Sequence, residues 1–309
     1  MTGTDIDSAR AALAAIPAFS GRDVSGASIS RLGGMTNLVF RVDFGDDSYC
    51  LRLPGEGTSE YIDRSVEKTN ATAAAAAGVS PEVVHFGDDG VMVTRFLDGA
   101  ATMSPDLFAT TPGAVERAGK AFRKLHDKAG TFAFRFELFS MIDEYLGHLT
   151  KLGAEVPDGY HDVVAEADTV RSALAAHELP LAPCHCDPLC ENFLDTGETM
   201  WIVDWEYSGM NDPMWDLGDL SVEGGFDDAM DQRLMEAYFG GPPNPVDQGR
   251  MVIYKAMCDL LWTLWGLIQH ANNNPAEDFW AYSINRFERC KALMAKPNFA
   301  AHVETVRKG

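Results

Sequence analysis

The segment 185–192 reads HCDPLCEN, and it places His185, Asp187 and Asn192 in the spacing H-x-D-x4-N. In such a loop, a carboxylate can accept a hydrogen bond and then the proton of an attacking hydroxyl group. An amide oxygen a few residues later can bind Mg²⁺ without adding charge. The segment therefore predicts Asp187 as a general base and Asn192 as a metal ligand.

A further aspartate, Asp204, follows the apolar stretch 201–203, where a second oxygen ligand for Mg²⁺ is expected. The catalytic loop of protein kinases has the same H-x-D-x4-N spacing. Three fixed residues in an acidic loop also arise by chance, so this interpretation depends on what the rest of the chain contains.

Upstream, residues 32–38 (LGGMTNL) form a glycine turn between two β-type stretches, and such a turn can bring backbone N–H groups close to phosphates. Three residues of this turn are expected to contact ATP: Gly34, Thr36 and Asn37. Arg52 lies on the following strand and Glu67 on the next predicted helix, which is the order of parts in a kinase. A surface ion pair is the alternative interpretation of these two residues.

The character of the sequence changes near residue 97. Residues 28–53 predict three antiparallel strands, 61–77 a helix, and 83–86 and 91–96 two more strands. After that point, six segments have helical spacing: 114–129, 141–152, 162–176, 228–239, 248–270 and 276–295. We therefore predict an α+β protein with a sheet-containing domain 1–97 and a mainly helical domain 98–309.

Composition excludes several classes of function. The chain has 309 residues, with 25 Lys and Arg against 46 Asp and Glu, a net charge of −21 and a pI near 4.6. Such a charge repels nucleic acids and anionic membranes. No apolar run approaches the roughly 18 residues of a membrane span, and the first residues lack the pattern of a secretory signal. We expect a cytoplasmic protein with no nucleic-acid partner and no membrane insertion.

Three of the six cysteines are close together, at 184, 186 and 190, next to His185 and Asp187. Such side chains can bind zinc, but the spacing of these cysteines does not match the paired C-x2-C motifs of structural zinc sites. We expect reduced thiols and no metal at these cysteines.

Four aromatic residues form a second group of interest. Trp262 and Trp265 are three apart in a helical segment and share a face, and Tyr207 and Tyr282 could close a box with them. Such a box suits a quaternary ammonium group, which has no N–H donor and is held by aromatic faces. Core packing is the alternative, because aromatic pairs at helical spacing are usually buried.

Taken together, the sequence resembles the choline and ethanolamine kinases, which are relatives of the aminoglycoside phosphotransferases on the protein-kinase-like fold. The resemblance covers most of the chain and rests on the following segments: 33–37 (GGMTN), 51–53 (LRL), 185–187 (HCD), 190–192 (CEN), 204–207 (DWEY), 216–218 (DLG) and 261–265 (LWTLW). It implies a two-lobed fold with a small antiparallel-sheet lobe and a larger helical lobe, and with Mg²⁺ and ATP between them. It also implies that Arg52 contacts the ATP phosphates and is held by Glu67, and that tryptophans and a tyrosine line the choline pocket.

The chain departs from the family at Cys186, where a small polar residue or glycine is common, and at Leu189, where some relatives have glutamine. These departures affect the prediction of the substrate more than that of the reaction. The expected activity is ATP-dependent phosphorylation of a small cationic amino alcohol, with choline favoured over ethanolamine as the substrate. Alternatives are a kinase for an aminoglycoside, an amino sugar or thiamine, or a catalytically silent nucleotide- or amine-binding protein. A homodimer is possible.

Three other polar residues have simpler expected roles. His126 is expected to pack or hydrogen-bond within the protein. Asp216 and Asp219 are expected to orient the catalytic loop through hydrogen bonds.

Overall fold

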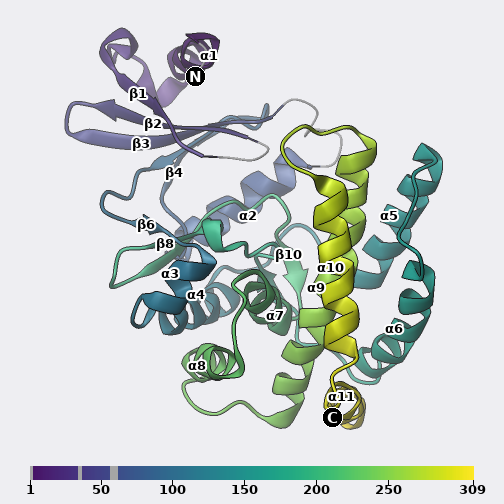
Figure 1. Ribbon diagram of the computed structural model, residues 1–309. Coiled ribbons are helices and arrows are strands. Elements are labelled where there is room, and N and C mark those ends of the chain that lie inside the picture. The colour runs from purple at the N-terminus through teal and green to yellow at the C-terminus, as the bar shows by residue number, and fades with distance from the viewer. Residues whose placement is uncertain (1–2, 34–36, 56–61) are drawn as a thin grey trace.

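The smaller lobe is built on a five-stranded antiparallel sheet in the order β1-β2-β3-β5-β4 (Figure 1). The computed structural model describes residues 3–33, 37–55 and 62–309. The strands of this sheet are β1 (Ser28–Arg31), β2 (Leu38–Phe44), β3 (Asp47–Leu53), β4 (Val83–Phe86) and β5 (Met92–Arg95). Alternate residues of the central strands, such as Phe40, Val42 and Leu51, are fully buried, as expected for a sheet with one covered face.

Two helices accompany this sheet. Helix α1 (Gly3–Ala15) packs beside β1 and supplies Leu13 to the core of the small lobe. Helix α2 (Arg64–Ala76) begins at Asp63, whose carboxylate caps the first turn. The buried Ala71 and Ala74 of α2 belong to the core of the larger lobe, so α2 connects the two lobes.

The larger lobe is mainly helical. Its helices are α3 (Pro105–Thr110), α4 (Ala114–Lys128), α5 (Leu138–Leu152), α6 (Tyr160–Leu174), α7 (Pro213–Glu223), α8 (Asp228–Phe239), α9 (Pro245–Ala271), α10 (Phe279–Met294) and α11 (Phe299–Lys308). Two small antiparallel sheets carry the loops of the site described below, and all of their strands except β6 lie between α6 and α7 in sequence. One pairs β6 (Ala101–Thr102), β8 (Phe193–Asp195) and β9 (Met200–Ile202), and the other pairs β7 (Ala182–Cys184) with β10 (Gly209–Asn211).

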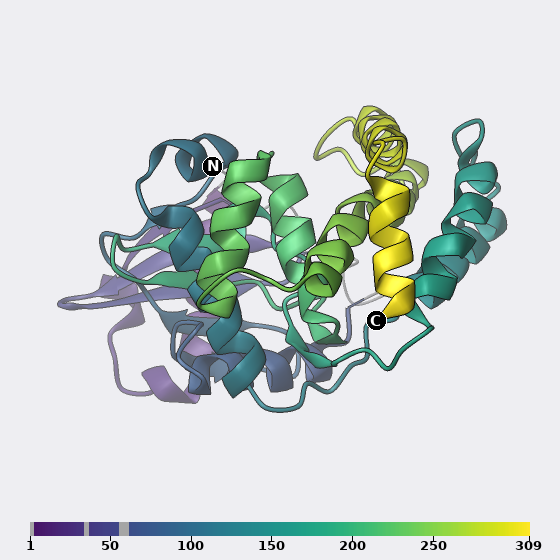
Figure 2. The same cartoon turned by 90° about the horizontal axis from the view of Figure 1, so that it is seen from below.

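Helix α9 is the centre of the larger lobe. It packs against α5, α7, α10 and α11, and Figure 2 shows the yellow C-terminal helix α11 beside it. By length and composition α9 could cross a membrane, and within the described residues it is the one helix that could. However, 78% of its most apolar window is buried inside the protein. Its apolar character is therefore that of a core helix.

The predicted fold class is confirmed: the protein is α+β, with a small antiparallel-sheet lobe and a larger helical lobe. All five predicted strands of the small lobe are present, and the predicted helix 61–77 corresponds to α2, although residue 61 lies outside the described residues. The six predicted helices of the larger lobe also form, with ends that differ by a few residues. The boundary at residue 97 stays a prediction, and it falls between β5 and β6.

Four helices were not predicted: α1, α3, α7 and α11. Helix α7 is the most informative case, because ten of its eleven residues are buried. A helix that is buried on all sides shows no polar face, so the periodicity that indicates a surface helix is absent.

Candidate active site

The loop that carries Asp187 is held in place by Asp216, at the first turn of α7. Its two carboxylate oxygens accept hydrogen bonds from the backbone N–H groups of His185 and Cys186, each at 2.8 Å. Cys186 has a left-handed backbone (φ 67°), and its carbonyl accepts a bond from Trp215 Nε1 at 3.0 Å. These bonds stabilise the turn that presents the next residue, Asp187.

Asp216 is in turn oriented by a histidine. His126 Nε2 lies 2.9 Å from Asp216 Oδ2, and His126 Nδ1 lies 3.0 Å from the hydroxyl of Tyr238. The expectations for His126 and Asp216 are thus met by their contacts. The expectation for Asp219 was wrong, because its hydrogen bond comes from Trp262 of α9 and not from the catalytic loop.

Asn192 lies at the end of a short 3₁₀ turn, Cys190–Asn192, and is buried. Its Nδ2 donates to the backbone carbonyl of Asp187 at 3.0 Å. Because the amide nitrogen is used in this bond, the amide oxygen is the atom that can bind a cation. The predicted metal ligand and the predicted base are therefore directly linked.

Asp204 follows β9 and has a left-handed backbone, with φ of 68°. Its Oδ1 has no hydrogen-bond donor and lies 3.9 Å from Arg52 Nη1. Carboxylate oxygens of Asp204, Glu67 and Glu206 all lie within 4.8 Å of one another. Burial and the charge of Glu206 raise the pKa of Asp204 well above its ordinary value, with Arg52 opposing them. An orphaned oxygen in a cluster of carboxylates fits a hard divalent cation such as Mg²⁺.

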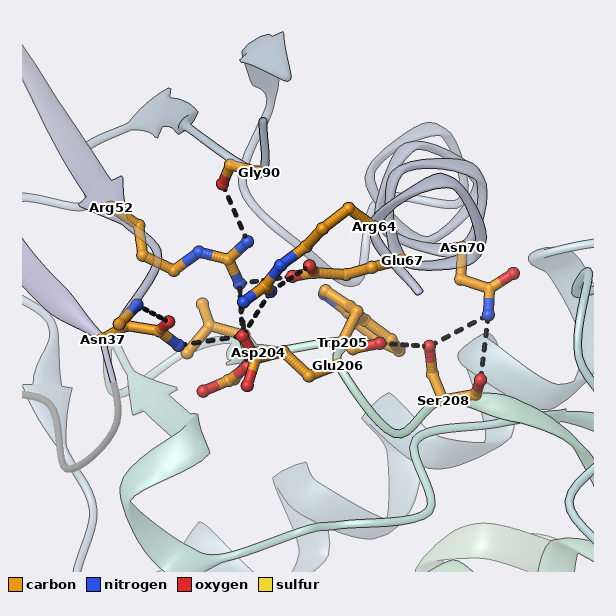
Figure 3. A network of polar contacts seen from close by, with 12 residues as sticks. Asn37, Arg52, Arg64, Glu67, Asn70, Gly90, Asp204, Trp205, Glu206 and Ser208 are labelled. Atoms are coloured by element: carbon orange, nitrogen blue, oxygen red, sulfur yellow. Dashed lines mark hydrogen bonds and ion pairs between the residues drawn. The ribbon is translucent and has the colours of Figure 1, made fainter. Parts of the chain in front are cut away.

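The cation of β3 is part of a buried ion-pair network (Figure 3). Arg52 Nη1 pairs with Glu67 Oε1, and Arg52 Nη2 donates to the carbonyl of Gly90 at 3.3 Å. The contact between Arg52 and Glu67 that the family resemblance implied is thus present. Their role toward ATP stays a prediction.

Sequence reasoning missed two members of this network, Arg64 and Glu206. Arg64 Nη1 donates to Glu67 Oε2 at 2.7 Å and to Glu206 Oε1 at 2.6 Å. Glu206 Oε1 also accepts from Asn37 Nδ2 at 2.9 Å. The signals were available, since Arg64 stands one helical turn before Glu67 and Glu206 stands two residues after Asp204. Gly34 and Thr36, which were also predicted to contact ATP, lie outside the described residues.

Asp187 has the environment of a base that works near neutral pH. Burial raises its pKa to about 7, the charges of Glu223 and Glu206 add to the rise, and Arg286 opposes it. A base with a pKa near the working pH combines a useful ionised fraction with a useful affinity for the proton.

The four aromatic residues predicted to form a box do come together. Tyr207 and Trp262 meet edge to face with ring centroids 5.4 Å apart, and Trp265 Nε1 donates to the hydroxyl of Tyr207 at 2.9 Å. Trp265 and Tyr282 follow at 5.8 Å. Burial raises the pKa of the Tyr282 hydroxyl, and the negative charges of Glu223 and Asp187 add to this rise against Arg286, so Tyr282 lies within electrostatic range of Asp187.

Charged residues lie behind these rings. Trp262 Nε1 donates to Asp219 Oδ2 at 3.2 Å, and Arg286 lies over the ring of Tyr282 with its guanidinium carbon 4.6 Å from the centroid. Arg286 pairs with Glu223 at 2.6 Å and with Asp259 at 3.1 Å. Glu223 and Arg286 were not predicted to be part of the site, and Asp219 was predicted only to orient the catalytic loop.

Among the described residues, the clustered cysteines Cys184, Cys186 and Cys190 do not come together in one group of metal-compatible side chains. All six cysteines are free thiols, and five are buried. Within the described part of the chain, the one metal-compatible group with a cysteine is His126, Cys184 and Asp216. Its histidine and aspartate are hydrogen-bonded to each other, and the Cys184 thiol points to the carbonyl of Asn211 at 3.5 Å.

Comparison with known families shows to which family the chain belongs. The choline/ethanolamine kinase family model matches residues 29–234, which is more than half of the chain. The chain belongs to the choline/ethanolamine kinase family. As a member it is a phosphotransferase that acts on an alcohol acceptor.

Similar solved structures and curated relatives agree with this family assignment. A choline/ethanolamine kinase family protein from Mesorhizobium loti is 62% identical, with a TM-score of 0.90 over 99% of this chain and 100% of the other. Choline kinase LicA from Streptococcus pneumoniae is 26% identical, with a TM-score of 0.73 over 87% and 93% of the two chains. Ethanolamine kinase 2 from Mus musculus is 24% identical over 289 residues, which are 82% of this chain and 71% of the mouse protein.

A more distant likeness concerns the fold alone. Spectinomycin phosphotransferase is 13% identical, with a TM-score of 0.55 over 91% of this chain and 93% of the other. The fold is therefore shared with aminoglycoside phosphotransferases, as the sequence predicted.

Proposed function

We propose that this kinase transfers the terminal phosphate of ATP to the hydroxyl group of a small amino alcohol, and that choline is favoured over ethanolamine. The observation that carries the proposal is the contiguous set of aromatic rings, Tyr207, Trp262, Trp265 and Tyr282, in the same region as Asp187. Aromatic faces attract a quaternary ammonium group without needing an N–H donor. Ethanolamine, a primary ammonium, would leave its three N–H groups to be satisfied elsewhere.

Asp187 is the proposed base. Its carboxylate accepts the hydrogen bond of the substrate hydroxyl, orients that oxygen toward the phosphate, and takes up its proton as the bond to phosphorus forms. The hydrogen bonds from His185 and Cys186 to Asp216 keep the loop rigid, so the oxygen is aligned before reaction.

The nucleotide is proposed to be ATP with Mg²⁺. Asn192 and Asp204 would hold Mg²⁺, which when bound neutralises charge on the phosphates. Arg52, anchored by Glu67, is the proposed phosphate contact, together with Asn37 and the turn before it. A LicA structure that is 26% identical to this chain was solved in complex with AMP, which supports nucleotide binding by this chain.

Two wider proposals accompany this function. A cytoplasmic location fits an ATP-dependent enzyme with six free thiols. A homodimer is also proposed, and size-exclusion chromatography with light scattering would test it.

The function is tested by ADP release in a coupled assay. Candidate acceptors are choline, ethanolamine, methylated ethanolamines, thiamine, glucosamine and aminoglycosides. We expect the highest kcat/KM with choline, falling as N-methyl groups are removed. A higher kcat/KM for ethanolamine, for a sugar or for thiamine than for choline would overturn the proposed preference for choline. The proposal that the protein is a kinase would stand. No ADP release with any acceptor would favour a silent binding protein.

A further inference from the structure

The carboxylate of Asp219 is not explained by the packing of α7. It is 1% exposed in the middle of this helix, and its Oδ1 has no hydrogen-bond partner within the described structure. A buried carboxylate that is only half satisfied costs stability, and asparagine or an apolar residue would fill the same space at lower cost. A residue kept under these conditions is a candidate for a functional role.

Neighbouring charges do not neutralise Asp219. Arg286 pairs with Glu223 and Asp259, and Arg289 pairs with Asp259 at 2.6 Å. Three carboxylates, Asp219, Glu223 and Asp259, thus face two guanidinium groups, so that 2 − 3 leaves one negative charge when all are ionised. Burial and the charges of Glu223 and Asp187 raise the pKa of Asp219 well above its ordinary value, with Arg286 opposing them. An ammonium group bound at the ring of Trp262 would favour the ionised form of Asp219.

The hydrogen bond to Asp219 comes from one ring of the aromatic box. Trp262 Nε1 donates to Asp219 Oδ2 at 3.2 Å. An indole whose N–H group is bonded to an anion gains electron density over its ring, and its face attracts a cation more strongly. The rest of the box differs, because Trp265 donates to the neutral hydroxyl of Tyr207, and Tyr282 already has the cation of Arg286 over its ring.

We propose that Asp219 is a specificity-determining residue that acts through Trp262: its carboxylate strengthens the attraction of the indole face for the positive charge of a bound ammonium group. This inference rests on the proposed amine-alcohol kinase activity. It makes Trp262 the strongest cation-binding face of the box and Tyr282 the weakest. Asp219 is a positioning residue, since it is too buried to contact the substrate itself.

The test separates charge from shape with two acceptors. Choline and 3,3-dimethyl-1-butanol have the same outline and the same hydroxyl group, but only choline is charged. For the wild type and for Asp219→Asn, kcat/KM is measured with both alcohols. We expect the preference for choline to fall by about three- to tenfold in Asp219→Asn, through a higher KM for choline, while KM for the neutral alcohol stays within about twofold. A merely structural role would change both values together.

Two further variants complete the design. Trp262→Phe keeps a ring but removes the N–H donor, so it should lower the same preference, and adding Asp219→Asn to it should have little further effect. Asp162→Asn, an exposed change on α6, removes an equal charge from the surface and should leave the preference unchanged. If Asp219→Asn folds poorly, the preference for choline over the neutral alcohol is compared between Trp262→Phe and the wild type. An unchanged preference in Trp262→Phe would overturn the proposal.

The possible failures are distinguishable. A wild type that phosphorylates neither alcohol overturns the proposed function itself. A wild type that prefers choline, together with an unchanged preference in Asp219→Asn and Trp262→Phe, overturns only the role of Asp219. Fully additive effects of the two substitutions would show that Asp219 does not act through Trp262.

Discussion

Arg64 Nη1 donates to Glu206 Oε1 at 2.6 Å, and this bond joins the first turn of α2 in the small lobe to the loop after β9 in the large lobe. The same nitrogen donates to Glu67, the partner of Arg52. Both side chains of the Arg64–Glu206 pair are 7% exposed, so water screens the pair only weakly. The orientation of the two lobes and the position of Arg52 are thus coupled through one guanidinium group.

Replacing Arg64 tests this coupling. In Arg64→Gln, Glu67 and Glu206 lose a shared partner, and breaking such a pair leaves buried charge uncompensated at a cost of about 3 kcal/mol. We expect a lower melting temperature and, because Glu206 then competes with the phosphates for Arg52, a KM for ATP raised severalfold. Differential scanning fluorimetry and initial rates measure both.

A control for Arg64 lies on the same helix. Lys68 pairs with Asp88 at 3.0 Å in an exposed position. Since exposed ion pairs contribute little, Lys68→Gln should leave both values near those of the wild type. If Arg64→Gln behaves like Lys68→Gln, the interlobe pair has no role in stability or ATP binding.

The pH dependence of the reaction should report Asp187. Its raised pKa of about 7 means that the free enzyme loses the ionised base as the pH falls through 7. The logarithm of kcat/KM for the alcohol is therefore expected to fall with a slope of about 1 below pH 7 and to level off above it. A profile that is flat down to pH 5 would contradict the assigned base.

The matching substitution is Asp187→Asn. It should remove most turnover and leave ATP affinity little changed, because the base acts on the hydroxyl group and not on the nucleotide. Burial favours the neutral side chain, so stability gained by the substitution should appear above pH 7, where the wild-type carboxylate is ionised, and fade below it. Turnover close to that of the wild type would rule out the role.

The metal site is tested at Asp204. Asp204→Ala should raise the Mg²⁺ concentration needed for half-maximal activity by tenfold or more and lower turnover, because it removes a charged oxygen ligand. The residue has a left-handed backbone, which alanine adopts with strain and asparagine tolerates. Asp204→Asn therefore removes the charge with less effect on the backbone, and a Mg²⁺ dependence unchanged in both variants would contradict the assignment.

Replacing the two tryptophans of the box by leucine should have similar effects on choline binding but different effects on stability. Both Trp262→Leu and Trp265→Leu lose an aromatic face worth about 0.5–2 kcal/mol, so KM for choline should rise by about two- to thirtyfold with KM for ATP little altered. Trp262 is 4% exposed and Trp265 is half-buried, so the cavity left by the first substitution should also lower the melting temperature more. A fall in melting temperature without a change in KM for choline would indicate a core role alone.

The local sequence was sufficient for much of this structure. Alternation in residues 28–53 predicted β1 to β3, and the spacing within 185–192 predicted one loop that carries both Asp187 and Asn192. The hydrogen bond from Asn192 to the carbonyl of Asp187 was found only in the structure. Such patterns predict strands and short loops correctly because these structures depend mainly on residues that are close in sequence. Helix α7 was not predicted for the opposite reason, since its sequence pattern depends on the helices that surround it.

The sequence by itself determined which chemical groups are available: carboxylates at Asp187 and Asp204, an amide at Asn192, a cation at Arg52 and aromatic residues at 207, 262, 265 and 282. Only the tertiary structure decided which charges meet. Arg64 and Glu206 are 142 residues apart, and Asp219 and Trp262 are 43 apart, so neither pair has a local pattern. Packing of the lobes brings such groups into a poorly solvated interior, where a single unbalanced carboxylate has an effect that the same residue would not have in water.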